Sequence, residues 1–112
     1  MLKTIDIDGR PVAFKATAST ARKYRQQFNR DLLIDMQNLS ASVGNGQTLS
    51  AAALETFENI AFTMAKQADD TIPDTADEWL DEFGMFSIYE ILPKIIELWG
   101  ISTQTIEESK KK

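Results

Sequence analysis

L-K-T-I-D-I-D-G-R-P-V-A-F-K-A, residues 2–16, carries the clearest structural pattern in this 112-residue chain. Ile5 and Ile7 alternate with polar residues, an aspartate-glycine pair follows, and Val12 and Phe14 alternate again. Alternation on both sides of such a pair is typical of a β-hairpin. Because an isolated hairpin is only marginally stable in water, its apolar face is expected to pack on helices.

The position of the turn within this hairpin stays open. A loop at Gly9-Arg10 pairs Ile7 with Val12 across the two strands. A loop at Asp8-Gly9 pairs Ile5 with Val12 instead. Both registers place the apolar side chains on one face, so the hydrophobic pattern does not choose between them.

Helical spacing begins after the hairpin. A first helix is expected from a cap at Ser19 or Thr20 to Asn29, because asparagine tolerates the left-handed conformation that ends helices. A second helix is expected from Asp31, and one continuous bent helix is the alternative. Residues 40–49 are small and turn-rich, which predicts a loop. The apolar stripe of the second helix comprises Leu32, Leu33, Met36 and Leu39.

A third helix is expected over residues 50–68, with one apolar face from which Phe62 falls away. Pro73 stops any helix in the turn that follows. A fourth helix is expected over residues 75–83 and a last one over 87–99. Each of these two starts with the pattern of a capping box, in which a hydroxyl accepts from a backbone N–H and a glutamate reaches back. The capping pairs are Thr75 with Glu78 and Ser87 with Glu90.

These elements predict an α+β fold that is mostly α, with the N-terminal hairpin packed on a bundle of about four to five helices. Residues 1–100 form a single domain in this interpretation. Residues 101–112 are polar and are expected to be a disordered tail. Pro93 falls on the polar side of the last helix, where a helix that curves around a core can accommodate it.

The composition excludes several kinds of chemistry. The chain has no cysteine and no histidine, so disulfides, thiolate metal sites and the commonest general base are absent. No apolar run is long enough to span a bilayer, and the N-terminus lacks the apolar stretch of a signal peptide. The carboxylates over residues 77–82 are expected to form a solvated face of a short helix rather than a catalytic pair. We therefore expect no enzyme activity, no catalytic residue, no cofactor, no metal and no membrane partner.

Charge is distributed unevenly along the chain, whose net charge is −5. Residues 1–48 hold seven basic and four acidic side chains, whereas residues 49–112 hold five basic and thirteen acidic ones. The acidic balance argues against a nucleic-acid partner, because phosphate neutralisation needs a surplus of lysine and arginine. The two halves can pair within one molecule, or can steer one molecule's head toward another's tail in self-association.

Large apolar side chains gather in the last third of the chain, with no catalytic group among them. A domain of this size has a limited interior, so those at the edges of helical stripes are expected to stay exposed for a protein partner. Core packing is the alternative for each of them. The candidate protein-binding residues are Phe62, Trp79, Phe83, Phe86, Tyr89, Ile96 and Trp99.

A series of short runs in a fixed order carries a family resemblance. The runs are I-D-I-D-G-R-P-V-A-F-K-A-T at 5–17, Y-R-Q-Q-F at 24–28, R-D-L-L-I-D-M at 30–36, F-E-N-I-A at 57–61, M-A-K-Q-A-D at 64–69, D-E-W-L at 77–80, F-S-I-Y-E-I-L-P at 86–93 and E-L-W at 97–99. Together they resemble the small tail assembly chaperones of long-tailed phages and prophages of Gram-positive bacteria. The resemblance covers residues 2–100 nearly end to end, and Asn29 stands where many relatives have glycine.

The resemblance implies a chaperone that works in the cytoplasm of the bacterial host and is absent from the mature virion. Such chaperones bind the long, helical tape measure protein, keep it soluble and help recruit tail tube protein around it. The family often has a longer form made by a ribosomal frameshift, and the lysine codons of residues 110–112 fit such a slippery site. A solubilising basic tip is the alternative for these lysines. The family names no catalytic residue.

Two other functions remain open from the sequence. A structural phage component, such as a tail completion or adaptor protein, would share the lack of chemistry but would be present in the virion. A small DNA-binding regulator would use the basic residues of the first helix, against the net charge of the chain.

Overall fold

The computed structural model describes residues 2–44, 50–84 and 86–97. The fold of these residues is α+β and mostly α, with an N-terminal antiparallel hairpin and five helices, as the sequence predicts. The predicted tail over residues 101–112 lies outside the described residues. The elements are β1 (Leu2–Ile7), β2 (Arg10–Lys15), α1 (Ala18–Phe28), α2 (Leu32–Gly44), α3 (Ala51–Ala68), α4 (Ala76–Leu80) and the 3-10 helix η1 (Ile88–Ile91).

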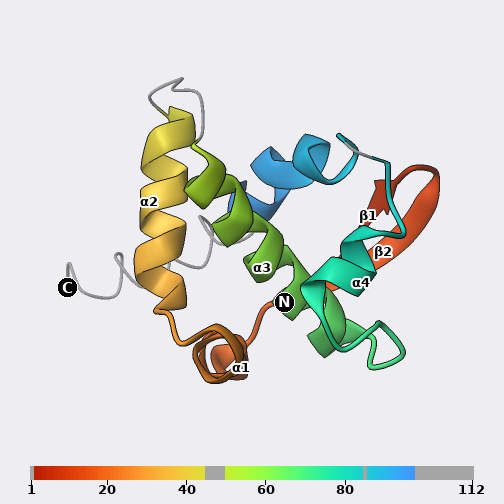
Figure 1. Ribbon diagram of the computed structural model, residues 1–112, viewed down its shortest axis with the longest axis horizontal. Coiled ribbons are helices and arrows are strands. Elements are labelled where there is room, and N and C mark those ends of the chain that lie inside the picture. The colour runs from red at the N-terminus through yellow and green to blue at the C-terminus, as the bar shows by residue number, and fades with distance from the viewer. Residues whose placement is uncertain (1, 45–49, 85, 98–112) are drawn as a thin grey trace.

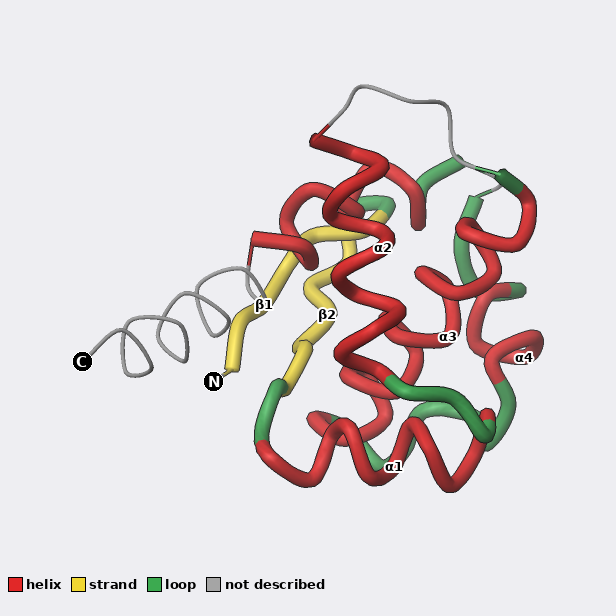
Figure 2. Tube along the Cα trace, turned by 90° about the vertical axis from the view of Figure 1, so that its left-hand side faces the viewer, coloured by secondary structure: helices red, strands yellow, loops and turns green. Residues whose placement is uncertain are grey.

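The elements are arranged around α3. In Figure 1, α3 runs diagonally through the middle, with α2 on one side and the hairpin and α4 on the other. Figure 2 shows α1 lying across one end of the molecule, beneath α2. Each neighbour of α3 therefore covers a different part of its surface.

The hairpin turn is a two-residue loop at Asp8-Gly9. Both residues have positive φ, 54° and 77°. Ile5 consequently lies opposite Val12. Positive φ at both positions matches the right-handed twist of the strands, and glycine at the second position adopts it without strain. Backbone twist thus selects one of the two registers that the hydrophobic pattern left open.

The apolar face of the hairpin is buried, as predicted. Ile5, Ile7, Val12 and Phe14 all belong to the hydrophobic core, and β2 packs directly on α3. Burial against a helix supplies the apolar contact that a two-stranded sheet lacks by itself.

The chain breaks between α1 and α2, so the prediction of two helices is confirmed. Asn29 ends α1 with φ of 57°, in the left-handed conformation expected of it. The carboxylate of Asp31 then accepts a hydrogen bond from the Ile34 N–H at 3.1 Å, which caps the start of α2. The predicted cap of α1 at Ser19 or Thr20 is wrong, because α1 begins at Ala18 with Thr17 in the N-cap position.

The loop predicted over residues 40–49 is wrong for its first half, because α2 continues to Gly44. Small residues do not break a helix that packs on its neighbours, and glycine is common only at the end. Leu39, the last residue before the predicted loop, is buried and holds this end of α2 on the core. Residues 45–49 lie outside the described residues.

The middle of α3 is buried on nearly all sides. Six consecutive residues, from Ile60 to Ala65, are buried, and Phe57 is buried as well. A helix that is covered all round has no polar face in its centre. The prediction that Phe62 falls outside the core is therefore wrong. The neighbours of α3 cover more of the helix than the single apolar face that the sequence spacing predicts.

The helices after the turn are shorter than predicted. Thr75 caps α4 as expected, and its hydroxyl accepts from the Glu78 N–H at 3.2 Å, but α4 ends at Leu80. The capping box at Ser87 is wrong, because that hydroxyl makes no cap hydrogen bond. The last helical segment starts as η1 and becomes α-helical over residues 92–97.

Pro93 explains this tight start of the last segment. Proline has no N–H to donate four residues back, so the chain preceding it closes with shorter-range bonds, including the one from the Leu92 N–H to the Tyr89 carbonyl. Pro93 itself is exposed, in agreement with its predicted outward position. It stands at the beginning of the α-helical turn, where a missing N–H is tolerated.

A buried polar cluster joins α1 to α2. The Tyr24 hydroxyl donates to Asp35 at 2.7 Å, and the Arg30 guanidinium donates to both oxygens of the same carboxylate at 2.7 and 2.8 Å. These hydrogen bonds, led by the one from Arg30, hold the pKa of Asp35 below its ordinary value despite burial. The cluster fixes the angle between the two helices without leaving a polar atom unsatisfied.

Removal of the Asp35 carboxylate is expected to destabilise the fold. Asp35→Ala leaves the buried Tyr24 hydroxyl without an acceptor, which costs about 1–3 kcal/mol of unfolding free energy. Urea denaturation at neutral pH measures this loss. Asp70→Ala is the matched control, because Asp70 is exposed and should change stability by less than about 0.5 kcal/mol. Equal stability of the two variants would contradict the role of the cluster.

The same carboxylate makes stability depend on pH in a defined direction. Its pKa is lower in the folded chain than the ordinary aspartate value of about 3.9, so the unfolded chain binds more protons in acid. The contribution of Asp35 is complete above that ordinary value and is lost as the pH falls through the lower, folded value. Urea denaturation of the wild type and Asp35→Asn from pH 7 to pH 3 should show the difference between them shrinking in acid.

Candidate functional site

Two of the seven predicted protein-binding residues are buried. Phe62 is 0% exposed and Trp79 is 1% exposed. Trp79 packs among aromatic rings from the hairpin, from α3 and from the segment after α4, with centroid distances of 6.4 Å to Phe14, 6.1 Å to Phe62 and 5.1 Å to Phe83. Both Phe62 and Trp79 thus belong to the core, and the expectation of these two as binding residues is corrected.

Four of the predicted residues lie at the surface at least in part. Phe86 is 71% exposed, and Phe83, Tyr89 and Ile96 are half-buried against the core. Trp99 lies outside the described residues. We call Phe83, Phe86, Tyr89 and Ile96 the rim residues, because they border the core along the segment from α4 to residue 97.

Polar contacts hold two of the rim residues in place. The Arg10 guanidinium lies 5.3 Å from the centroid of the Phe83 ring, a cation–π contact, while its ion pair with Glu82 spans 3.0 Å. The Tyr89 hydroxyl donates to the carboxylate of Glu58 on α3, and this hydrogen bond raises the pKa of Tyr89. These contacts hold the partly exposed rings of Phe83 and Tyr89 in fixed positions.

The turn of the hairpin anchors the segment that carries Phe86. One oxygen of the Asp8 carboxylate accepts from the Gly84 N–H at 2.7 Å, and the other accepts from the Ser87 hydroxyl. These two hydrogen bonds, first the one from Ser87, lower the pKa of Asp8. Phe86 lies in the sequence between Gly84 and Ser87, so the hydrogen bonds of Asp8 hold the backbone near the exposed phenylalanine.

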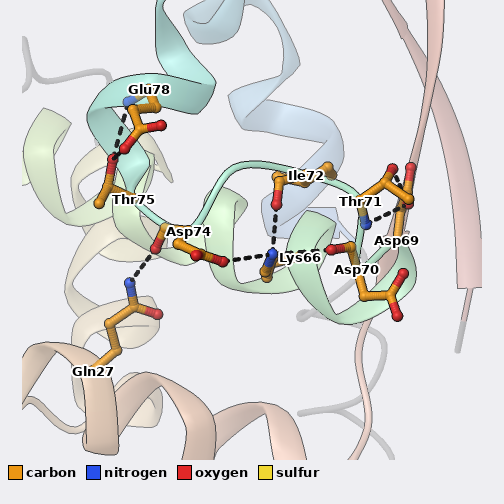
Figure 3. A network of polar contacts seen from close by, with 9 residues as sticks. All are labelled: Gln27, Lys66, Asp69, Asp70, Thr71, Ile72, Asp74, Thr75 and Glu78. Carbon is orange, nitrogen blue, oxygen red and sulfur yellow. Dashed lines mark hydrogen bonds and ion pairs between the residues drawn. The ribbon is translucent and has the colours of Figure 1, made fainter.

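A second polar network orders the turn between α3 and α4 (Figure 3). The Lys66 ammonium donates to the carbonyls of Asp70 and Ile72 and pairs with the Asp74 carboxylate at 3.1 Å. Gln27 of α1 donates to the Asp74 carbonyl at 3.4 Å. This network sets where α4 begins and thereby where Trp79 enters the core.

An apolar patch at the start of α2 was not predicted from the sequence. Leu33 is 48% exposed and Ile34 is 55% exposed, whereas Leu32 and Met36 are buried. Leu33 was expected on this helix together with Leu32, Met36 and Leu39, and it is the one of the four that is exposed. The sequence spacing could have predicted this exposure. Leu32, Met36 and Leu39 fall on one helical face, and positions 33 and 34 point away from that face. We call Leu33 and Ile34 the α2 patch.

Charge is segregated between two regions of the chain. Residues 15–30 contain five basic side chains and no acidic one, whereas residues 69–93 contain eight acidic side chains and no basic one. The three ion pairs among the described residues join Arg10 to Glu82, Arg30 to Asp35 and Lys66 to Asp74. Pairing within the molecule therefore leaves most charges of both regions facing solvent.

Other kinds of site find no support in the part of the chain that is described. No group of three or more acidic residues gathers there in a way that would hold a metal ion. None of the helices within residues 2–44, 50–84 and 86–97 combines the length and apolar character needed to cross a membrane. Comparisons with protein-family models, curated proteins and solved structures find no match to this chain.

Weakening the Asp8 contacts is expected to loosen the segment around Phe86 while sparing the hairpin. Asp8→Asn keeps a residue suited to positive φ, and Asn-Gly is a favourable hairpin turn, but the variant loses the charge and one acceptor oxygen. Amide hydrogen exchange at Gly84 should become faster, while exchange at Ile5 and Val12 in the paired strands should not change.

The matched control for this measurement is Asp6→Asn, which removes a charge from the exposed side of β1. It should leave exchange at Gly84 as in the wild type. Unchanged exchange at Gly84 in Asp8→Asn would contradict the anchoring role of Asp8.

Proposed function

We propose that this protein is a non-enzymatic tail assembly chaperone of a long-tailed phage or prophage. It binds the tape measure protein, keeps it soluble and helps recruit tail tube protein. It acts in the cytoplasm of the bacterial host and is left out of the finished virion. The proposal starts from the series of sequence runs that resembles this family across residues 2–100.

The observation that carries the proposal is the set of exposed and partly exposed rim residues, of which Phe83 and Tyr89 are held by specific contacts. A tape measure protein of the expected kind is a long helix with apolar stripes that it cannot bury alone. An apolar stripe of a helix is commonly covered by a complementary apolar surface of a partner. Tyr89 and Ile96 both lie on the last helical segment and are partly exposed, so their apolar edges are suited to that contact.

The charge of the chain supports the same role. Three of the rim residues, Phe83, Phe86 and Tyr89, lie within residues 69–93, where every charged residue is acidic. A complex that exposes a negative surface resists further association through charge repulsion. The chaperone would thus cover the apolar stripe of its client and add solubility at the same time.

The test is co-expression with the tape measure protein that the neighbouring gene encodes. The wild-type chain should keep that protein in the soluble fraction and copurify with it. The double variant Tyr89→Ala, Ile96→Ser removes two apolar contacts of at least about 1 kcal/mol each and should weaken binding by about 30-fold or more. Titration of the purified variants with a tape measure fragment measures that loss.

Leu2→Ser serves as the control, because Leu2 is 66% exposed and stands at the start of β1, at the other end of the strand from the turn that contacts the Phe86 segment. It should bind as the wild type does, and thermal unfolding should confirm that all variants are folded. A folded double variant that binds the client with unchanged affinity would overturn the assignment of the surface. A client that stays insoluble with the wild-type chain, or the presence of this chain in purified virions, would overturn the function itself.

A further inference from the structure

Phe86 and Tyr89 project on the same side of the chain where it enters η1. The Tyr89 N–H donates to the Phe86 carbonyl at 3.2 Å, and the Glu90 N–H donates to the Ser87 carbonyl at 3.3 Å. In turns that are closed by bonds between residues three apart, side chains three positions apart lie above one another. The ring of Phe86, which is 71% exposed, and the partly exposed ring of Tyr89 therefore face solvent together. We call these two rings the aromatic pair.

Carboxylates from three elements lie beside the aromatic pair. Glu58 of α3 accepts the hydrogen bond of the Tyr89 hydroxyl, and Asp8 of the hairpin turn accepts that of the Ser87 hydroxyl. Glu90 follows Tyr89 directly in η1 and is exposed. We call Asp8, Glu58 and Glu90 the carboxylate border, because the fold brings them to the aromatic pair from distant parts of the sequence.

Basic side chains of the domain do not balance this negative charge. The ion pairs among the described residues engage other carboxylates and none of the carboxylate border. Arg10, which follows the hairpin turn, is paired with Glu82 at 3.0 Å and lies over the ring of Phe83. The first base that follows the aromatic pair in the sequence is Lys94. The aromatic pair is thus an apolar surface with an excess of negative charge at its edges.

We propose that the client segment bound here is an amphipathic helix whose apolar stripe is flanked by lysine or arginine. The stripe would cover the aromatic pair, and the basic side chains beside it would face the carboxylate border. Burial of apolar surface supplies attraction, and the opposite charges select the partner. A helix is suited to this arrangement because the residues that flank its apolar stripe recur at every turn.

This inference rests on the proposed function for the existence of a helical client, and it adds the chemistry which that client must display. The carboxylate border disfavours the other occupants of an exposed aromatic surface. A helix with acidic flanks would bring like charges together, which costs binding free energy. A membrane surface rich in anionic lipids attracts basic segments and would be repelled here for the same reason.

Binding of model helices to the purified full-length chain tests this chemistry. Two labelled peptides share one leucine stripe and differ only in their flanks, which are lysine in one and glutamate in the other. Fluorescence anisotropy should give an affinity for the lysine-flanked peptide at least about tenfold higher, and higher salt should narrow that difference. A third peptide keeps the lysines and has serine in place of leucine. It should bind more weakly than the first, because charge alone does not supply the apolar contact.

Variants of the chain assign the preference to particular side chains. Glu90→Gln should reduce the preference for lysine flanks by about threefold, as expected for the loss of one exposed charge. Asp70→Asn is its matched control, because Asp70 is exposed in the turn after α3 and should leave the preference unchanged. Phe86→Ser should weaken binding of the lysine-flanked peptide by about fivefold or more, whereas Leu33→Ser in the α2 patch should not. All four positions are exposed, so melting temperatures should stay within a few degrees of the wild type.

Equal affinities for the lysine-flanked and glutamate-flanked peptides, no binding of either peptide, or unchanged binding by Phe86→Ser would overturn the inference. Its failure is distinguishable from failure of the proposed function, which co-expression with the client tests. A client kept soluble by a chain that binds both peptides equally would contradict the charge preference alone. A client that stays insoluble with a chain that prefers lysine flanks would contradict the function and leave the chemistry of the surface standing.

Discussion

Most of this domain packs against the middle of one helix. The residues of α3 from Phe57 to Ala65 are covered by the hairpin, by α1, by α2 and by α4, and none of these neighbours is large enough to form a core alone. Apolar burial scales with the area removed from water, so a small domain gains most by surrounding one element completely. The hairpin in particular depends on this arrangement, because its two strands have no other sheet partner among the described residues.

The same arrangement determines which aromatic residues remain at the surface. Trp79 packs against the hairpin and α3, and Ile88, Ile91 and Ile95 of the chain that follows enter the same core. Phe86 lies on the connection between these buried residues, and the contacts of Asp8 hold Gly84 and Ser87 near it. Phe86 itself stays exposed while its neighbours in sequence are buried.

Agreement between sequence and structure is best where the signal is local. Asn29, Asp31, Ser50 and Thr75 all occupy the helix ends expected of them, because a cap depends on a side chain and a backbone only a few residues away. The error at Phe62 has a cause that is not local. Periodicity tells which residues share a helical face, but it does not tell how many faces of that helix the rest of the chain will cover.

The amino-acid sequence by itself determined the apolar face of the hairpin, the order of the helices, several of their ends and the segregation of charge, since each depends on neighbours along the chain. The hydrogen bond of Ser87 depends on tertiary structure alone. Its hydroxyl donates to the carboxylate of Asp8, 79 residues away in the sequence, instead of capping its own helix. Tertiary structure also settled which of the predicted aromatic residues reach solvent. A contact between distant residues depends on the packing of everything between them, and no pattern within a short window encodes that packing.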